Sequence, residues 1–245
     1  MAAVSVIAMI PARFDSSRLP GKALAEIGGV PMIVRVWRQT RQAQSLDRVI
    51  VATDDERIMR AVRAAGGEAE MTASTHQSGT DRIAEVAARI QAEIYLNVQG
   101  DQPFIAPEDL DALVAPMRAE PALSMATLAT PIRDAEEWYN PNKVKVVCDG
   151  RGDAIYFSRS PIPFARNGGM PPNARRHIGV YGYRRDFLLR FAALEPGVLE
   201  QIEKLEQLRA LERGYRIRVV ESVAPSLEVD TPDDLVRANE TAAKL

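Results

Sequence analysis

Three cationic side chains lie close together near the start of the sequence. Arg13, Arg18 and Lys22 fall within ten residues, directly after the apolar run 4–10. Arg offers phosphate oxygens a planar fork of donors, Lys offers a point charge, and backbone N–H groups complete a cradle. A solvated basic loop is the simplest alternative, but a buried strand before the loop and a helix after it favour phosphate binding. The loop is neither a Walker A loop nor a dinucleotide-binding glycine turn, so the sequence predicts a phosphate-binding loop of another kind.

A carboxylate follows another predicted strand, 94–98. Gln99 and Asp101 stand at its carboxyl end, where Asp101 would face the three cations. Mg²⁺ takes one or two carboxylates plus substrate oxygens, so Asp101 is a candidate metal ligand. Asp230 could supply the second carboxylate. Because Asp230 directly precedes Thr-Pro, spacing alone favours helix capping for this residue.

Two other stretches carry polar groups whose role the pattern leaves open. Residues 72–82 are dense in hydrogen-bond donors before a helix, which suits either a pocket that reads base and ribose edges or a long polar cap. His177 begins a predicted strand, while Glu206 and Gln207 lie on a predicted amphipathic helix, 199–213. For Glu206, on the flank of the apolar face, a solvated position is the default expectation.

The elements that must position these residues alternate between strand and helix in the first half. Pro31, Pro107 and Gly66 stand where helices begin and end. Predicted strands are 4–10, 48–52, 68–71, 94–98 and 124–129; predicted helices are 31–42, 55–65, 79–91 and 107–119. This alternation predicts a mostly parallel sheet covered on both faces, with ligands beyond the carboxyl ends of its strands.

The pattern changes after residue 130. Residues 143–148 and 154–158 flank a Gly-rich turn and predict a β-hairpin. A Pro- and Gly-rich loop, 161–173, follows, and loops of that length are usually functional. The remaining predicted elements are a strand at 177–183, helices at 185–194 and 199–213, a strand at 216–220 and a last helix at 232–244.

Length and composition limit the possible functions. With 245 residues the chain can form one large α/β domain, and a net charge of −2 argues against a nucleic-acid surface. Cys148 is the only cysteine, which excludes a disulfide within the chain and suits a reducing cytoplasm. The apolar start lacks a basic leader and is cut short by Pro11 and Arg13, so we expect no targeting segment. No run approaches the ~20 apolar residues of a membrane span, and we expect a soluble cytoplasmic protein.

Nine short motifs follow one another along the chain. They are Ile-Pro-Ala-Arg (10–13), Arg-Leu-Pro-Gly-Lys (18–22), Val-Ala-Thr-Asp (51–54), His-Gln-Ser-Gly-Thr (76–80), Asn-Val-Gln-Gly-Asp (97–101), Tyr-Phe-Ser-Arg (156–159), His-Ile-Gly-Val-Tyr-Gly-Tyr (177–183), Glu-Lys-Leu-Glu-Gln-Leu-Arg (203–209) and Val-Asp-Thr-Pro (229–232). Each motif alone is weak, whereas the ordered set is specific. Through this set the chain resembles, from about residue 5 to 237, the 3-deoxy-manno-octulosonate (Kdo) cytidylyltransferases.

The resemblance implies an activity and a fold. It implies a Mg²⁺-dependent nucleotidyltransferase that couples CTP to the acidic sugar Kdo, releasing pyrophosphate and giving CMP-Kdo for lipopolysaccharide. The implied fold is α/β, with a mostly parallel, Rossmann-like nucleotidyltransferase sheet in a single domain, 1–245. A smaller β-rich insert at roughly 130–185 would carry the hairpin and form a homodimer.

The resemblance also assigns roles to single residues. The implied catalytic residues are Lys22, Arg13, Asp101 and Asp230, of which the two aspartates would hold the metal. The triphosphate would contact Arg13, Arg18 and Lys22, and the cytidine would contact Ser78, Gly79 and Arg82. The sugar would contact Gln99, Arg159, His177, Tyr183, Glu206 and Gln207, with Arg159 facing either the sugar carboxylate or the phosphates.

One residue departs from the family pattern. Gln102 stands where the family usually has Glu, in Gly-Asp-Gln-Pro. The change could weaken metal binding, move the preference to a related acidic sugar such as 8-amino-Kdo or a nonulosonate, or have little effect. We expect little effect, because Asp101 and Asp230 remain. A nucleotide-binding protein without catalysis is the alternative of a different class.

Overall fold

The computed structural model describes residues 4–15, 19–224 and 227–244. Contacts between Cα atoms divide the chain into two compact units. The first comprises Met1–Asp111 and Ser226–Leu245, and the second comprises Ala112–Pro225. Helix α4 (Pro107–Ala119) runs through the point of division.

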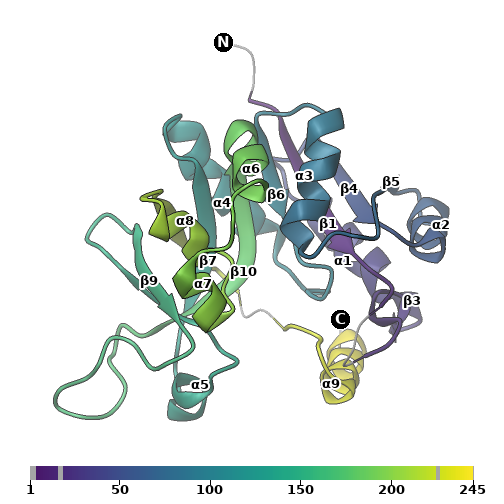
Figure 1. Cartoon of the computed structure of the whole chain (residues 1–245). Helices are drawn as coiled ribbons and strands as arrows, with labels where there is room; N and C mark the ends of the chain where they lie inside the picture. Colours follow the sequence, from purple (N-terminus) through teal and green to yellow (C-terminus); the bar gives the residue numbers. More distant parts are fainter. Residues whose placement is uncertain (1–3, 16–18, 225–226, 245) are drawn as a thin grey trace. The chain divides into compact units, whose positions relative to one another are not determined.

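A parallel sheet forms the centre of the first unit (Figure 1). Its strand order is β6-β1-β4-β5, and every neighbouring pair is parallel. The strands are β1 (Val6–Ala12), β4 (Arg48–Thr53), β5 (Glu68–Met71) and β6 (Ile94–Asn97). Strands β1, β4 and β6 are apolar over nearly their whole length, as expected for strands that are buried on both faces.

Helices cover both faces of this sheet. The chain passes outward from β1 through β4 to β5 by way of α1 (Met32–Thr40) and α2 (Glu56–Ala64). It then returns to β6 through α3 (Gly79–Arg89). Because crossovers between parallel strands are almost always right-handed, this reversal of direction puts α3 on the face opposite α1 and α2. In Figure 1 α3 lies in front of the strands, and α1 and α2 contact each other.

Local sequence sets where these helices begin and end. Asp55 caps α2 by accepting a hydrogen bond from the Arg57 N–H, and Gly66, at φ 84°, follows its end. Ser78 caps α3 in a capping box with Asp81. The predicted helix and strand positions in this unit are therefore confirmed to within a few residues.

Shorter elements complete the first unit. The loop after β1 leads into the 3₁₀ helix η1 (Lys22–Leu24) and a small hairpin of β2 (Glu26–Ile27) and β3 (Val30–Pro31). Helix α9 (Pro232–Ala242), capped by Thr231, packs against β2. The Asn239 side chain accepts a hydrogen bond from the Gly28 N–H at 3.0 Å, which ties α9 to the hairpin.

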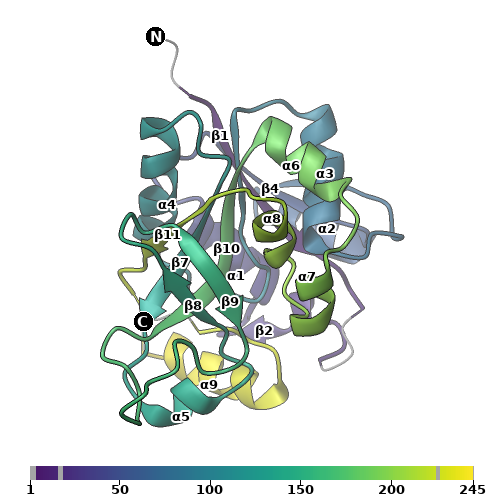
Figure 2. The same ribbon diagram turned by 60° about the vertical axis from the view of Figure 1, so that its left-hand side comes forward.

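The strands of the second unit pair both in parallel and antiparallel (Figure 2). Strand β7 (Met125–Pro131) pairs in parallel with β11 (Ile217–Glu221) and antiparallel with β10 (Arg175–Arg184). The predicted hairpin is confirmed as β8 (Lys145–Cys148) and β9 (Ala154–Ser158), and β8 pairs with β10. A short helix, α5 (Ala135–Tyr139), was not predicted; its Trp138 packs with Ile132 and Ala174.

One predicted helix of this unit is wrong. The segment 199–213 forms two short helices, α7 (Val198–Glu203) and α8 (Leu208–Glu212), after α6 (Arg185–Ala192). The break falls at Lys204, which adopts the left-handed conformation at φ 55°. Glu206 and Gln207 consequently lie in the turn between two helices rather than on the flank of one.

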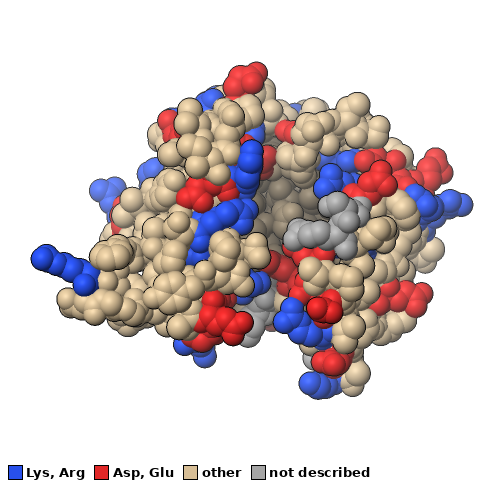
Figure 3. Space-filling model, turned by 60° about the horizontal axis from the view of Figure 1, so that its bottom comes forward, with Lys and Arg blue, Asp and Glu red and all other residues tan. Residues whose placement is uncertain are grey.

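Charged side chains of both signs occur on the surface of the molecule. Lys and Arg side chains are interspersed with Asp and Glu over the face drawn in Figure 3, rather than gathered into one basic surface. Among the described residues, no helix is both long enough and apolar enough to cross a bilayer.

Candidate active site

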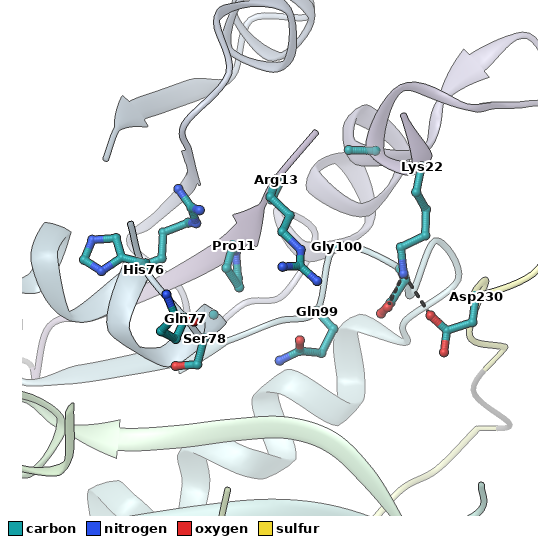
Figure 4. A pocket seen from close by; sticks show the side chains of 14 residues that line it. Pro11, Arg13, Lys22, His76, Gln77, Ser78, Gln99, Gly100 and Asp230 are labelled. Carbon is teal, nitrogen blue, oxygen red and sulfur yellow. Dashed lines mark hydrogen bonds and ion pairs between the residues drawn. The ribbon is translucent and has the colours of Figure 1, made fainter. Parts of the chain in front are cut away.

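A polar cavity of about 310 Å³ opens in the first unit, at the carboxyl ends of its strands. All of its walls come from this unit. The lining residues are Pro11, Ala12, Arg13, Lys22, Ala23, His76, Gln77, Ser78, Gly79, Arg82, Gln99, Gly100, Asp101 and Asp230. Figure 4 shows Arg13 extending into the cavity from the end of β1.

Two glycines let the walls of the cavity approach one another closely. A Cβ atom on Gly79 would lie 3.0 Å from Cγ of Pro11, and one on Gly100 would lie 3.1 Å from the Pro11 carbonyl oxygen. Pro11 is therefore held between the start of α3 and the loop after β6. This close approach explains why glycine stands in both the 76–80 and the 97–101 motifs.

The centre of charge in the cavity is Lys22 between two carboxylates. Its Nζ lies 2.7 Å from Oδ2 of Asp101 and 3.0 Å from Oδ1 of Asp230 (Figure 4). Burial alone lowers the pKa of Lys22, but the two carboxylates outweigh it and the pKa is raised above its ordinary value. Lys22 is therefore a charged ammonium throughout the neutral pH range.

Asp230 reaches this position because it does not cap α9. Thr231 is the N-cap, and its hydroxyl accepts a hydrogen bond from the Asp234 N–H. The Asp230 backbone N–H is held by the Asp234 carboxylate at 3.1 Å, and the Val229 N–H donates to the Asp101 carbonyl at 2.9 Å. The Asp230 carboxylate thus points away from the helix, toward Lys22, and the capping alternative is excluded.

The two carboxylates fit a magnesium site. Both reach within 3.0 Å of a single nitrogen, so one small cation could contact both. In the part of the chain that the structure describes, no group of three or more His, Cys, Asp or Glu side chains is suited to a metal. A pair of carboxylates completed by substrate oxygens is the usual protein site for Mg²⁺, whereas a full cage of protein ligands is not.

The residues expected to contact a base or ribose form the opposite wall. Ser78 uses its hydroxyl to cap α3, which leaves the N-terminal N–H groups of that helix beside the cavity. Arg82 is buried, and its guanidinium donates to Asp54 at 2.7 Å and Thr72 at 2.5 Å. Arg82 therefore joins the ends of β4 and β5 at the wall of the cavity.

Two other residues of the first unit bear on these predictions. Gln99 lines the cavity and donates a hydrogen bond from Nε2 to Oδ1 of Asn97 at 3.1 Å. Gln102 is only 1% exposed and is not a lining residue. Arg18 lies outside the described residues.

His177 is a buried, neutral histidine in the second unit. Its Nε2 lies 2.9 Å from the Thr127 hydroxyl, whose proton is directed to the Val180 carbonyl at 2.8 Å. The imidazole must therefore donate from Nε2, and Nδ1 is its acceptor. Burial lowers the pKa of His177 to about 3, so the ring is neutral at ordinary pH.

The two tyrosines of β10 differ in their surroundings. Tyr183 is fully buried and stacks on Phe187 and Phe191, so its ring belongs to the aromatic core of the unit. The Tyr181 ring lies beside the His177 ring, at 5.4 Å between centroids and tilted by 44°. Burial, with a contribution from the Glu206 carboxylate, raises the pKa of Tyr181. Tyr181 therefore lies nearer than Tyr183 to the other polar residues expected to face a sugar, a distinction that the motif alone does not make.

The remaining expected residues of this unit lie around the break between α7 and α8. The Gln207 amide is buried, and its Nε2 has no hydrogen-bond partner among the residues described. Arg159 donates from Nε to the Glu203 carbonyl at 2.7 Å and from Nη1 to the Pro141 carbonyl at 3.1 Å. Its guanidinium thus holds the end of α7 against the loop before β8.

The structure brings together eight of the predicted site residues in the cavity of the first unit. They are Arg13, Lys22, Ser78, Gly79, Arg82, Gln99, Asp101 and Asp230. His76 and Gln77 also line it, although neither was assigned a role. The motif 76–80 could have indicated this position in the sequence. His76 and Gln77 directly precede the start of α3, which faces the cavity, so they border the cavity as well.

Known proteins share this architecture. Residues 7–217 match the sequence pattern of the cytidylyltransferase family. The solved structure of a CMP:2-keto-3-deoxy-manno-octonic acid synthetase complexed with CTP superimposes with a TM-score of 0.94 at 46% identity, covering 98% of this chain and 99% of that one. A 4-diphosphocytidyl-2C-methyl-D-erythritol synthase from Anaerococcus prevotii, at 17% identity and a TM-score of 0.65, shares the fold. The predicted nucleotidyltransferase fold is thereby confirmed, and the protein is an enzyme of the nucleotidyltransferase class.

Curated relatives narrow the class. The 3-deoxy-manno-octulosonate cytidylyltransferase of Syntrophotalea carbinolica is 54% identical over 242 residues, covering 96% of this chain and 97% of the relative. That of Geobacter metallireducens is 51% identical over 251 residues, covering 98% and 99%. The chain belongs to the 3-deoxy-manno-octulosonate cytidylyltransferase family.

Proposed function

We propose that this enzyme transfers CMP from CTP to the anomeric hydroxyl of Kdo, giving CMP-Kdo and pyrophosphate for lipopolysaccharide synthesis. The observation that carries the proposal is the convergence of Lys22, Asp101 and Asp230 in a cavity that Arg13 also lines. Cations for a triphosphate and carboxylates for a divalent cation are the two requirements of nucleotidyl transfer. The names of the relatives supply the identity of the nucleotide and of the sugar.

The residues that the sequence assigned to the nucleotide and the metal have distinct parts in this reaction. Arg13, Arg18 and Lys22 bind the triphosphate and stabilise charge that develops on it as pyrophosphate leaves. The start of α3, with Ser78 and Gly79, borders the cytidine, while Arg82 holds this wall in place. Asp101 and Asp230 hold Mg²⁺. Bound between these two carboxylates, Mg²⁺ would supply Lewis-acid chemistry, a lower pKa for the attacking hydroxyl and screening of the repulsion between two anionic substrates.

The residues proposed to recognise the sugar are Gln99, Arg159, His177, Glu206 and Gln207. The ring of Tyr183, fully buried against Phe187 and Phe191, would support this site rather than contact the sugar. His177 is suited to this part because its neutral ring offers Nδ1 as an acceptor for a sugar hydroxyl. The buried Nε2 of Gln207 supplies a donor. A site built from oriented neutral donors and acceptors discriminates strongly among sugars, since a wrong substrate leaves buried polar groups unpaired.

The decisive experiment measures pyrophosphate release with CTP, Kdo and Mg²⁺. Parallel reactions replace Kdo with 8-amino-Kdo or a sialic acid, omit the sugar, or omit the metal. Release that requires both Kdo and the metal supports the proposal. Turnover only with another acidic sugar would show that the enzyme uses that sugar instead of Kdo. CTP binding without turnover on any sugar would contradict the proposed catalytic activity.

We also infer a cytoplasmic homodimer that forms through the insert at roughly 130–185. Tyr139, Ile155 and Phe164 of this segment are 59%, 61% and 87% exposed, an unusual exposure for large apolar side chains. A second copy of the chain would cover them. Light scattering on the purified protein tests the inference, and replacing Ile155 and Phe164 with Ser should favour the monomer.

A further inference from the structure

An aromatic ring and a guanidinium meet beside the loop that carries Lys22. The Cζ atom of Arg57, on α2, lies 3.4 Å from the centroid of the Phe14 ring. Cation–π contacts extend to about 6 Å from the ring centroid. A separation of 3.4 Å therefore means that the guanidinium lies directly on the ring. Neither residue lines the cavity, and the proposed reaction does not use either of them.

The guanidinium of Arg57 is held in place by its own helix. Asp55, the N-cap of α2, accepts hydrogen bonds from Nε of Arg57 at 3.0 Å and from Nη2 at 2.6 Å. The same carboxylate accepts the Arg57 backbone N–H at 2.8 Å. This bidentate pair leaves one face of the guanidinium plane for the Phe14 ring.

The Phe14 ring in turn lies against the residue that precedes Lys22. A Cβ atom at Gly21 would be 3.3 Å from Cζ of Phe14, so the ring edge borders the Gly21 Cα. Gly21 has φ 68° and begins η1, in which the Leu24 N–H donates to the Gly21 carbonyl at 2.8 Å. Lys22, the next residue, places its Nζ between the two carboxylates.

We propose that Phe14 and Arg57 are positioning residues that hold the start of η1, and with it Lys22, in place for the nucleotide. Their contact, the Phe14–Arg57 stack, joins the rigid end of β4 and the start of α2 to the loop after β1. A loop that is ordered before binding loses less conformational freedom when the triphosphate arrives. The inference rests on the proposed function for its consequence in CTP binding, but the ordering itself exists without any ligand.

The test uses Phe14→Leu, Arg57→Met and the double variant in the full-length protein. Without ligand, all three should show faster hydrogen exchange at the Lys22 and Leu24 amides. The dissociation constant for CTP, measured by calorimetry without sugar, should rise about two- to fivefold. Because both residues act through one contact, the double variant should be no weaker than either single variant. Phe14→Tyr, which keeps the ring, should behave like the unmodified protein.

Arg60→Met is the matched control. Arg60 is an exposed arginine on the same helix, and its Nε donates to the carbonyl of Glu56 at 3.3 Å. Removing its charge should change neither exchange nor CTP affinity. Additive effects in the double variant, equal effects of Arg60→Met, or unchanged exchange at Lys22 would overturn the proposal. An unmodified chain that binds no CTP would instead contradict the proposed function, and the exchange data would still decide whether the stack orders the loop.

Discussion

Lys22 occupies the position that a divalent cation would need. Its ammonium contacts both Asp101 and Asp230, so one of the two negative charges is balanced when no metal is bound. A metal that binds there must displace Nζ, which can then turn toward the phosphates of a nucleotide. The same lysine would therefore pair with the two carboxylates before the metal binds and with the phosphates afterwards.

Replacing Lys22 with Met should make this competition visible. Without the ammonium, two neighbouring carboxylates attract a cation more strongly, and Mn²⁺ should bind the nucleotide-free protein on the order of tenfold more tightly. Turnover should fall by ~10²–10³ because the phosphates lose a positive partner. Electron paramagnetic resonance of free Mn²⁺ measures the affinity without any reaction. Arg13→Met removes a cavity cation from elsewhere and serves as the control; equal or weaker Mn²⁺ binding by Lys22→Met would contradict the competition.

Gln102 illustrates a different constraint, that of burial. Its Oε1 is buried and has no hydrogen-bond partner among the described residues. Gln102→Glu would thus bury a carboxylate oxygen that has no hydrogen-bond donor among the described residues. We expect this to lower the free energy of unfolding by about 1–3 kcal/mol.

The cost of Gln102→Glu should depend on pH in a defined direction. Burial raises the folded-state pKa of the new carboxyl, so the folded protein binds more protons than the unfolded one. The variant should therefore lose stability, relative to the parent, as the pH rises from about 4 through neutrality. Urea unfolding at pH 5 and pH 8 measures this difference, with Gln102→Met as an uncharged control. A pH-independent difference would mean that the site accommodates the charge.

At the scale of elements, the break between α7 and α8 determines where Glu206 and Gln207 lie. Lys204 takes a left-handed backbone conformation that glycine adopts without strain. Lys204→Gly should stabilise the protein by up to about 1 kcal/mol, seen as a higher midpoint of thermal unfolding. Lys204→Ala keeps the Cβ atom and should give no such gain. If both variants behave alike, the side chain of Lys204 and not its backbone conformation decides the break.

The same break marks the limit of what the sequence could predict. The apolar spacing in 199–213 predicts one continuous helix, and the segment contains no glycine or proline that would predict a break at Lys204. Tertiary packing favours the broken helix, because Leu205 and Leu208 are both buried around the turn. In contrast, the strands and helices up to residue 119 were predictable because their apolar periodicity and caps agree.

The candidate site was predictable in part for a similar reason. Residues at the carboxyl ends of parallel strands must converge, so Arg13, Gln99 and Asp101 could be placed together from the strand pattern. The position of Asp230 could not, because its sequence suits a helix cap and only the structure assigns the cap to Thr231. Tyr181 and Tyr183 share a motif and face different surroundings, which spacing along one bulged strand does not resolve.

At the scale of the whole molecule, His177 links stability to pH. Its folded-state pKa of about 3 lies below the unfolded value near 6.5, so the unfolded chain binds the extra proton between these values. His177 therefore favours unfolding progressively as the pH falls from about 6.5 toward 3, by up to about 1.4 kcal/mol per pH unit.

Chemical unfolding of His177→Gln between pH 7 and pH 4 tests this contribution. Gln keeps a donor for the Thr127 hydroxyl but does not titrate, so the variant should lose less stability over this interval than the parent. His76 remains in both proteins and serves as an internal constant. A parent and variant with parallel pH profiles would contradict the assignment of the effect to His177.

The pairing of Lys22 with Asp230 also has a consequence for the order of events during synthesis. The two residues are 208 positions apart. At about 5–20 residues per second, a ribosome takes roughly 10 to 40 seconds to make the chain between them. During this time a nascent chain has Lys22 and, later, Asp101, but lacks the second carboxylate. Only a chain made as far as Asp230 has both aspartates, so under the proposed function a shorter nascent chain would not compete with the folded enzyme for Mg²⁺.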